Sequence, residues 1–417
     1  MQDRDLYTQI LGIRYPWKVA DVATDAAKQE VTIFVEPAAD AAFGCLVCGQ
    51  TTPRYDGRRR RWRHLDTCQY KTIVVADVPR IECPEHGVQQ VPVAWAETNS
   101  RFTGLFEALA INWLKEASIQ AVARLMRLTW KEVDGIMCRA VVRGLSRREL
   151  VPPERMGVDE TSFQKRHEYV TVVTDLDGSK VLYVADDRKA ESLAAFYRQL
   201  TPAQRKQIFV VAMDMHQPYI SATEEAVPDA DKKIAFDKFH VAKHLGDAVD
   251  KVRREEHAKL MAQDDWTLKH SKHLWLQNPD NMDETMWDST FRILRESSLQ
   301  TSRAWAIKEL AMTLWGYASR GWATKAWKKW IAWARRCHLE PMKKVAAMVR
   351  DHLKGIVNAI VLQATNAASE SINSKIQKVK RMACGFRNRE RFRNAIYFHL
   401  GGLDLYPASA MATHTNG

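Results

Sequence analysis

The 417-residue sequence has no hydrophobic run long enough to form a membrane-spanning helix, which needs about 20 largely apolar residues. Its first residues, Met1-Gln-Asp-Arg-Asp5, lack the basic and then apolar layout of a secretory signal. Glycine and proline are scarce as well, at 18 and 14 residues, which excludes a collagen-like or low-complexity chain. We therefore expect a folded cytoplasmic protein with about two to four domains.

Cysteine is also rare, and the seven cysteines are unevenly spaced, which argues against a disulfide framework. Two pairs have the spacing of metal ligands, in Cys45-Leu-Val-Cys48-Gly49 and Cys83-Pro-Glu-His86-Gly87. Because a glycine follows each pair and lets the backbone fold around an ion, Cys45, Cys48, Cys83 and His86 predict one structural Zn²⁺ with tetrahedral Cys₃His ligation. Chance coincidence of two unrelated pairs is the alternative. Cys68 fits neither pair.

The sequence also has fewer acidic than basic residues. It contains 50 Asp and Glu and 62 Lys and Arg, which gives a formal net charge of +12. Such an excess favours a polyanionic partner, above all nucleic acid, although an anionic membrane surface or a merely solvated surface would also suit it. Residues 303–393 alone hold 20 of the basic residues and 5 of the acidic ones. A second basic run, Arg58-Arg-Arg-Arg-Trp-Arg63, separates the two metal-ligand pairs. The residues predicted to contact DNA are Arg58, Arg59, Arg60, Arg61, Arg63, Lys131, Arg139, Lys328, Lys329, Lys375, Lys378, Lys380, Arg381, Arg387 and Arg389.

Apolar residues recur at helical spacing in three short segments between residues 102 and 145. Ser118 and Thr129 precede the second and third segments and are suited to cap them. Three short helices, the last two joined by a tight turn, predict a helix-turn-helix unit whose last helix enters the major groove of DNA. An ordinary helical bundle would give the same pattern.

A segment of different character follows Val151-Pro-Pro153, which breaks the helical pattern. Residues 155–213 predict three antiparallel strands, a crossover helix and a buried fourth strand, which together form the first half of a ribonuclease-H-like fold. In such a sheet the middle of the first strand and the end of the fourth strand lie side by side. Asp159 and Asp214 are therefore expected to meet.

A third carboxylate, Glu370, begins a late helix and completes an Asp, Asp, Glu set. Such a set can hold two Mg²⁺ or Mn²⁺ ions at the phosphate of a DNA strand. A carboxylate that ends an apolar strand is costly to bury without a counter-charge, although each aspartate could instead cap the next turn. Asp237 and His240 are candidates to support this site, and helix capping or core packing explains them equally well.

Residues 239–355 are helical in pattern, and nine of the 14 tryptophans lie between Trp266 and Trp333. We expect an all-helical insertion in which most of these rings pack in the core. The lysines and arginines between them are expected to face DNA.

Several motifs, in this order along the chain, resemble the ISL3 family of bacterial insertion-sequence transposases. They are the two zinc-ligand pairs, Gly157-Val-Asp159-Glu-Thr161, Val211-Ala-Met-Asp214-Met215, Phe236-Asp-Lys-Phe-His240 and Asn366-Ala-Ala-Ser-Glu370-Ser-Ile-Asn-Ser-Lys375. The resemblance covers nearly the whole chain and implies a DDE-type recombinase in which Asp159, Asp214 and Glu370 match the catalytic positions. It also implies that the helix-turn-helix recognises terminal inverted repeats. The expected partners are these repeats and target DNA, with no membrane partner and no small-molecule substrate. Because such an enzyme must hold two DNA ends, we expect a homodimer or larger.

The expected architecture is an α+β multidomain protein. Its parts are a zinc-binding ribbon (1–95), a helix-turn-helix domain (96–150), a ribonuclease-H-like core (151–238 and 356–405) interrupted by the all-helical insertion (239–355), and a frayed tail (406–417). We expect a bacterial, cytoplasmic enzyme that is nucleoid-associated when bound. Two other functions remain open: a catalytically inactive DNA-binding regulator on the same scaffold, and a metal-dependent nuclease that does not join strands.

Overall fold

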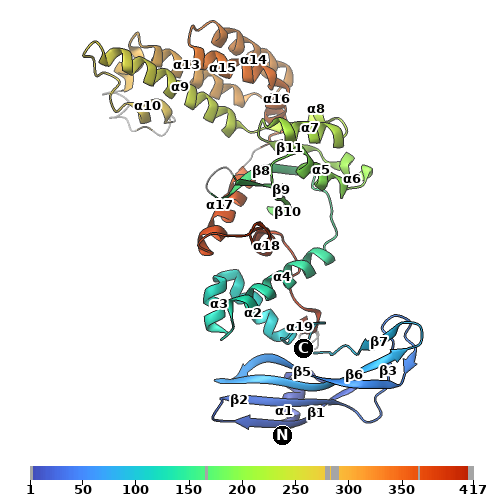
Figure 1. The fold of residues 1–417 in the computed structure, drawn as a ribbon. Helices are drawn as coiled ribbons and strands as arrows, with labels where there is room; N and C mark the ends of the chain where they lie inside the picture. The colour runs from blue at the N-terminus through green and yellow to red at the C-terminus, as the bar shows by residue number, and fades with distance from the viewer. Residues whose placement is uncertain (1–2, 165–167, 278–281, 283–290, 365–366, 412–417) are drawn as a thin grey trace. The chain divides into compact units, whose positions relative to one another are not determined.

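The computed structural model describes residues 3–164, 168–277, 282, 291–364 and 367–411. It divides into two compact units, and most of their helices and strands are labelled in Figure 1. One unit comprises Met1–Glu149, Arg381–Gly385 and Asn394–Gly417, and the other comprises Leu150–Lys380 and Phe386–Arg393. Within the described ranges, no helix is both long and apolar enough to cross a membrane.

A five-stranded sheet and a small hairpin begin the first unit. The sheet has the order β1-β2-β6-β5, with β7 beside β6, and only the β2–β6 pair is parallel. Alternate residues of β2 are buried, as the two-residue period of a strand requires. Trp95 packs edge-on against Trp17 and Trp62, with ring centroids 5.1 and 5.4 Å apart. The elements are α1 (Asp3–Ile10), β1 (Trp17–Asp25), β2 (Glu30–Pro37), β3 (Phe43–Gly44), β4 (Thr51–Thr52), β5 (Arg54–Thr67), β6 (Tyr70–Cys83) and β7 (Gly87–Gln90).

Three helices follow, as the sequence predicts: α2 (Gly104–Glu116), α3 (Ile119–Leu125) and α4 (Trp130–Arg147). Ser118 caps α3, because its side chain accepts a hydrogen bond from the Ala121 amide. Thr129 and Glu132 form a reciprocal capping box at the start of α4. The two caps fix the short turn between α3 and α4 and confirm the predicted helix-turn-helix layout.

A buried carboxylate joins α2 to α4. Glu107 is 1% exposed and accepts hydrogen bonds from Arg139 Nε at 3.0 Å and from Arg143 Nη2 at 2.9 Å. Removing one partner of a buried ion pair leaves an uncompensated charge, so this cluster fixes how α4 is rotated against α2. The pairing also ties the half-buried side chain of Arg139 to a buried carboxylate, although the sequence predicts that it contacts DNA.

The end of the described chain also packs on α2. Tyr406 Oη donates to Asn112 Oδ1 at 2.6 Å and accepts from Lys115 Nζ at 2.8 Å, and Leu405 is buried. Residues 406–411 are therefore ordered where the sequence predicts a frayed tail, and they end in the short helix α19 (Ala408–Met411). Residues 412–417 of that tail, Trp287 and Asn366 lie outside the described residues.

The second unit is built on a mixed sheet with the order β10-β9-β8-β11-β12. Strands β8, β9 and β10 are antiparallel, whereas β11 and β12 run parallel to β8. The Asp177-Gly178 turn joins β9 to β10, as the sequence predicts. The elements are β8 (Arg155–Gln164), β9 (Glu168–Asp175), β10 (Lys180–Ala185), α5 (Ala190–Arg198), α6 (Pro202–Gln207), β11 (Val210–Met213), α7 (Gln217–Ala226), α8 (Ala230–Lys233) and β12 (Ile234–Phe236).

Helices follow β12 and lead back to the core at α17. Asn358 of α16 is fully buried and links the sheet to the helices. Its Nδ2 donates to the backbone oxygen of Ile234 in β12 at 2.7 Å, and its Oδ1 accepts from Arg320 Nη1 at 2.7 Å. The mixed α/β core interrupted by helices is compatible with a ribonuclease-H-like fold and agrees with the expected architecture. The helices are α9 (Lys238–Met261), α10 (Lys272–Leu276), α12 (Arg292–Glu296), α13 (Gln300–Thr313), α14 (Arg320–Arg335), α15 (Glu340–Asp351), α16 (Leu353–Val361), α17 (Ala367–Met382) and α18 (Arg389–Leu400).

Candidate active site and metal centre

The register of the second sheet brings two of the predicted carboxylates together. Val158 of β8 pairs with Met213 of the parallel strand β11, and Asp159 and Asp214 follow at the next position of each chain. The charge of Asp214 also raises the pKa of Asp159. The two aspartates are 55 positions apart in the sequence, and they are neighbours because β8 and β11 lie side by side.

Asp159 is held in a partly buried position by two hydrogen bonds. Its Oδ1 accepts from the Glu160 amide at 2.7 Å, and its Oδ2 accepts from Asn373 Nδ2 at 2.7 Å. Burial is the main cause that raises the pKa of this carboxyl to about 6, and the hydrogen bond from the Glu160 amide and then the charge of His240 oppose the rise. A cation supplied at this carboxyl would therefore stabilise its ionised form.

Two polar residues at the start of α9, His240 and Asp237, lie close to Asp214 in space. Asp214 Oδ2 lies 3.8 Å from His240 Nε2, and His240 Nδ1 lies 3.5 Å from Asp237 Oδ2. Asp237 is 6% exposed and also caps α9, because it accepts from the Phe239 amide at 3.2 Å. The nearby carboxylate of Asp237 and the charges of Asp214 and Asp159 raise the pKa of His240. His240 therefore contacts Asp214 directly, Asp237 contacts His240, and Asp237 also caps α9.

Glu370 is exposed in the first turn of α17 and does not lie close enough to Asp159 and Asp214 to share an ion with both. Among the described residues, the three carboxylates are not all within 4.8 Å of one another. The helix nevertheless packs on this part of the sheet, because Ser369 Oγ lies 3.5 Å from Thr174 Oγ1 of β9 and Asn373 Nδ2 donates to Asp159 Oδ2 of β8. Glu370 therefore belongs to the helical turns beside Asp159.

Alternate residues of β8 meet every fourth residue of α17. Gly157 lies so close to Ser369 that an added Cβ would collide with Ser369 Oγ. Asn373 donates to Asp159, and Gln377 Nε2 donates to Thr161 Oγ1 at 3.0 Å. Four helical residues rise about 6 Å and two strand residues span about 6.6 Å, so helix and strand stay in step. Asn373 is a residue that the sequence prediction missed, and its four-residue spacing from Ser369 and Gln377 was the available signal.

The four predicted zinc ligands converge in the first unit. Cys48 Sγ lies 3.8 Å from Cys83 Sγ, and His86 Nδ1 lies 3.5 Å from Cys83 Sγ and 3.7 Å from Cys45 Sγ. In a tetrahedral site with Zn–S bonds of about 2.3 Å and Zn–N bonds of about 2.0 Å, neighbouring ligand atoms are roughly 3.5 to 3.8 Å apart. All four ligand atoms lie within 4.8 Å of one another, so the cluster fits zinc.

Local backbone geometry prepares this cluster. The first pair lies in the turn between β3 and β4, and the second pair lies where β6 turns into β7. Gly49 and Gly87 have φ angles of +73° and +69°, a conformation that glycine adopts without strain. Amides of Cys48 and Val47 point at the Cys45 sulfur and lower its pKa to about 6, which favours the thiolate that a metal binds.

The basic residues predicted to contact DNA fall into two groups. In one group the cation already has a protein partner: Arg61 pairs with Glu30, Arg63 with Asp66, Arg139 with Glu107 and Arg389 with Glu168, while Arg60 and Lys380 donate to backbone oxygens and Arg59 lies over Phe34. In the other group the side chain is exposed and the structure gives it no ion pair within the described residues. These residues are Arg58, Lys131, Lys328, Lys329, Lys375, Lys378, Arg381 and Arg387.

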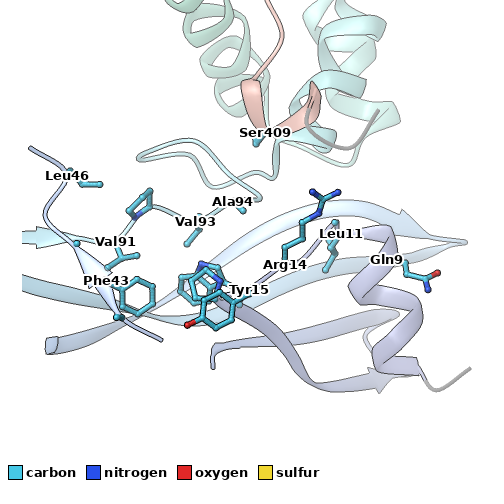
Figure 2. A pocket seen from close by; sticks show the side chains of 16 residues that line it. Gln9, Leu11, Arg14, Tyr15, Phe43, Leu46, Val91, Val93, Ala94 and Ser409 are labelled. Carbon is cyan, nitrogen blue, oxygen red and sulfur yellow. The ribbon is translucent and has the colours of Figure 1, made fainter. Parts of the chain in front are cut away.

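A pocket of about 630 Å³ lies next to the zinc cluster in the first unit. Figure 2 shows side chains that line it, among them Arg14, Tyr15 and Phe43, and it also includes Leu46 from the first zinc-binding turn. None of the residues that we single out for chemistry or DNA contact lines this pocket. It is therefore separate from the candidate sites.

Comparisons with known proteins cover the same three regions. The ISL3 model for DDE transposases, described as a transposase, matches residues 156–396. The model described as the zinc-finger of transposase IS204/IS1001/IS1096/IS1165 matches residues 41–86, and that for the helix-turn-helix domain of transposase family ISL3 matches residues 89–141.

Two curated relatives are similar over most of their length. The transposase for insertion sequence element IS1001 of Bordetella parapertussis is 29% identical over 371 residues, which is 87% of this chain and 89% of the relative. The transposase for insertion sequence element IS1557 of Mycobacterium tuberculosis is 27% identical over 421 residues, with 93% of each chain covered.

Proposed function

Because the chain belongs to the ISL3 family of transposases, with zinc-ribbon and helix-turn-helix DNA-binding domains, we infer that it acts on the ends of an insertion sequence. In this proposal it binds the terminal inverted repeats, cleaves a strand there and joins the freed end to target DNA. The observation that carries the proposal is the adjacency of Asp159 and Asp214 at neighbouring strand positions, next to the helix that bears Glu370.

The proposed chemistry is phosphoryl transfer at Asp159, Asp214 and Glu370. Two Mg²⁺ or Mn²⁺ ions, when bound by these carboxylates, would activate the attacking oxygen and stabilise the leaving oxygen. Hard carboxylate oxygens suit these ions better than zinc. The raised pKa of Asp159 fits a cation site, whereas Glu370 must approach the aspartates to join them.

The protein groups around the carboxylates have positioning roles. Asn373 fixes the orientation of the Asp159 carboxylate through its 2.7 Å hydrogen bond. His240, between Asp214 and Asp237, limits the rotation of Asp214 on its exposed side. Water is the attacking group in the first step and the freed 3′-hydroxyl in the second, so no side chain has to form a covalent bond with DNA.

The proposed DNA contacts are the eight exposed basic residues for which the described part of the chain offers no ion pair with a carboxylate. Lys131 lies in the first turn of α4, the helix that we expect in the major groove. Lys375 and Lys378 extend along α17 from Glu370, where a bound strand would reach the carboxylates. Because two element ends must be held at once, we propose a homodimer or larger assembly on DNA.

The test of this function is a strand-transfer assay. The full chain is incubated with labelled candidate element ends, a plasmid target and Mg²⁺, and the products are separated on a denaturing gel. We expect strand cleavage at the ends followed by labelled joined products. Binding without cleavage would instead indicate an inactive regulator, and cleavage without joining would indicate a nuclease.

Asn373→Ala is expected to slow cleavage about 10- to 100-fold, as is typical when a partner of a metal ligand is removed. The variant should also need more Mg²⁺ for half-maximal cleavage, because Asp159 loses the bond that orients it. The measurement is the cleavage rate as a function of Mg²⁺ concentration.

Gln377→Ala is the matched control for this variant. Gln377 lies one turn further along the same face of α17, but its partner is the Thr161 hydroxyl and not a carboxylate. Its Mg²⁺ dependence should equal that of the wild type. An equal shift in both variants would show that the helix packing matters and would remove the positioning role from Asn373.

A further inference from the structure

The structure separates the tryptophans of the helical insertion into two classes. Trp327 and Trp330 of α14 are fully buried, whereas Trp322 and Trp333 on the same helix are 63% and 40% exposed. The buried pair packs ring against ring at 5.5 Å and belongs to the core. The exposed pair needs another explanation.

The exposed rings share one face of α14 with cations. At 100° per residue, Trp333 falls within about 20° of Trp322 around the helix axis, and Lys329 lies on the same side. The rings are 11 residues apart, which is about 16 Å along the axis. We call this surface the α14 stripe; its members lie within about 60° of Trp322 and are Trp322, Lys325, Lys329, Trp333 and Arg336.

The α14 stripe is positive without internal compensation. Helix α14 contains no acidic residue, and residues 303–361 hold 12 basic residues and 3 acidic ones. Each of those three carboxylates is already paired with a neighbouring cation: Glu309 with Lys308, Glu340 with Lys343 and Asp351 with Arg350. The stripe therefore complements a polyanion.

Two exposed indoles are unnecessary on a helix face that only faces water. Lysine, alanine and glutamate form helices better than tryptophan, and exposed large rings lower solubility. Lys325 already lies over the Trp322 ring, with Nζ 5.4 Å from the ring centroid, so this ring is presented next to a cation. Such pairs of ring and cation are the elements with which proteins hold unpaired nucleic-acid bases.

We propose that the α14 stripe binds single-stranded DNA, with bases stacked on Trp322 and Trp333 and phosphates on the lysines between them. Duplex DNA would contact only the cations of the stripe, through its phosphates. Its bases are already stacked on one another and expose no face to an indole. This inference deepens the proposed function and rests on it in one respect: cleavage at an element end is the step that frees a strand.

The test measures binding of the full, zinc-loaded chain to a fluorescent oligonucleotide of mixed sequence, as a single strand and as a duplex, without Mg²⁺. The double variant Trp322→Ala, Trp333→Ala is expected to lose single-strand affinity about tenfold or more, from the stacking contribution of two bases. Its duplex affinity should stay within about twofold, since the cations remain. Phenylalanine at both positions should restore much of the loss.

Trp266→Ala is the matched control. Trp266 is 47% exposed and carries Lys269 over its ring at 4.7 Å, but it lies outside the α14 stripe, near the end of α9. This variant should bind both probes as the wild type does. Lys329→Ala should weaken both probes and lower the salt dependence, with a slope change of about 0.7 for the single strand.

Several results would overturn the proposal. Unchanged single-strand affinity in the double variant would mean that the rings do not stack on bases. An altered oligomeric state with unchanged affinity would mean that a second copy of the chain covers the stripe. Equal losses for single strand and duplex would mean that the rings support binding of either form of DNA and do not stack on unpaired bases. Because the assay involves no cleavage, its outcome is independent of whether strand transfer occurs.

Discussion

Asp159→Asn is expected to reduce strand cleavage about 10³-fold or more while binding of element ends stays within about twofold. The neutral amide cannot balance the charge of a divalent ion, and the DNA-binding domains of the other unit are unchanged. Burial disfavours the ionised carboxyl of Asp159, so the isosteric amide should leave Tm unchanged or raise it. The same loss is expected for Asp214→Asn and Glu370→Gln. Gel assays of cleavage, anisotropy of labelled ends and thermal unfolding measure the three effects.

Glu160→Gln provides the control for these variants. Glu160 follows Asp159 on β8, but successive residues of a strand point to opposite faces, and its carboxylate lies 3.6 Å from Arg188 Nη1 and 3.7 Å from His216 Nδ1. Cleavage should stay within about threefold of the wild type because no metal ligand is removed. A wild-type rate in a triad variant would remove that residue from the site. An equal loss of cleavage in Glu160→Gln would mean that the loss of any negative charge near the site causes the defect, and not the loss of a metal ligand.

The order of helices and strands in this chain can be predicted from signals that act within a few residues. Caps such as Ser118 and Thr129, the Asp177-Gly178 turn and the alternation of buried residues in the strands act within a few residues, so the sequence alone locates them. The adjacency of Asp159 and Asp214 could be expected as well, because the strand order of the inferred fold dictates it.

Contacts that depend on how elements are rotated could not be predicted. The Arg139–Glu107 pair joins residues 32 positions apart, and it forms only because α4 turns that face toward α2. The sequence predicts that all five arginines of residues 58–63, within β5, contact DNA, but a strand alternates its faces, and Trp62 among them is buried. Likewise, nothing local distinguishes the buried Trp327 from the exposed Trp322; the packing of α14 against α15 and α16 decides it.

Cys48→Ser is expected to remove the bound zinc and to unfold the two turns that carry the ligands. A structural zinc site contributes about 10 kcal/mol or more of apparent binding free energy, which is lost when the closed ligand set becomes incomplete. The large sheet has its own core around Trp62 and Trp95 and should stay folded. Binding of element ends should therefore weaken about tenfold or more without complete unfolding of the chain. Elemental analysis for zinc, circular dichroism and anisotropy of labelled ends measure these effects.

Cys68→Ser separates loss of a ligand from loss of a thiol. Cys68 is exposed in the turn between β5 and β6, where its φ angle is +55°, and it belongs to no cluster of ligands among the described residues. This variant should keep one zinc per chain and wild-type binding of element ends. Full zinc content in Cys48→Ser would contradict the ligand set. Loss of zinc with unchanged end binding would keep the metal site and assign recognition to the helix-turn-helix alone, because the ribbon would then contribute no contact of its own.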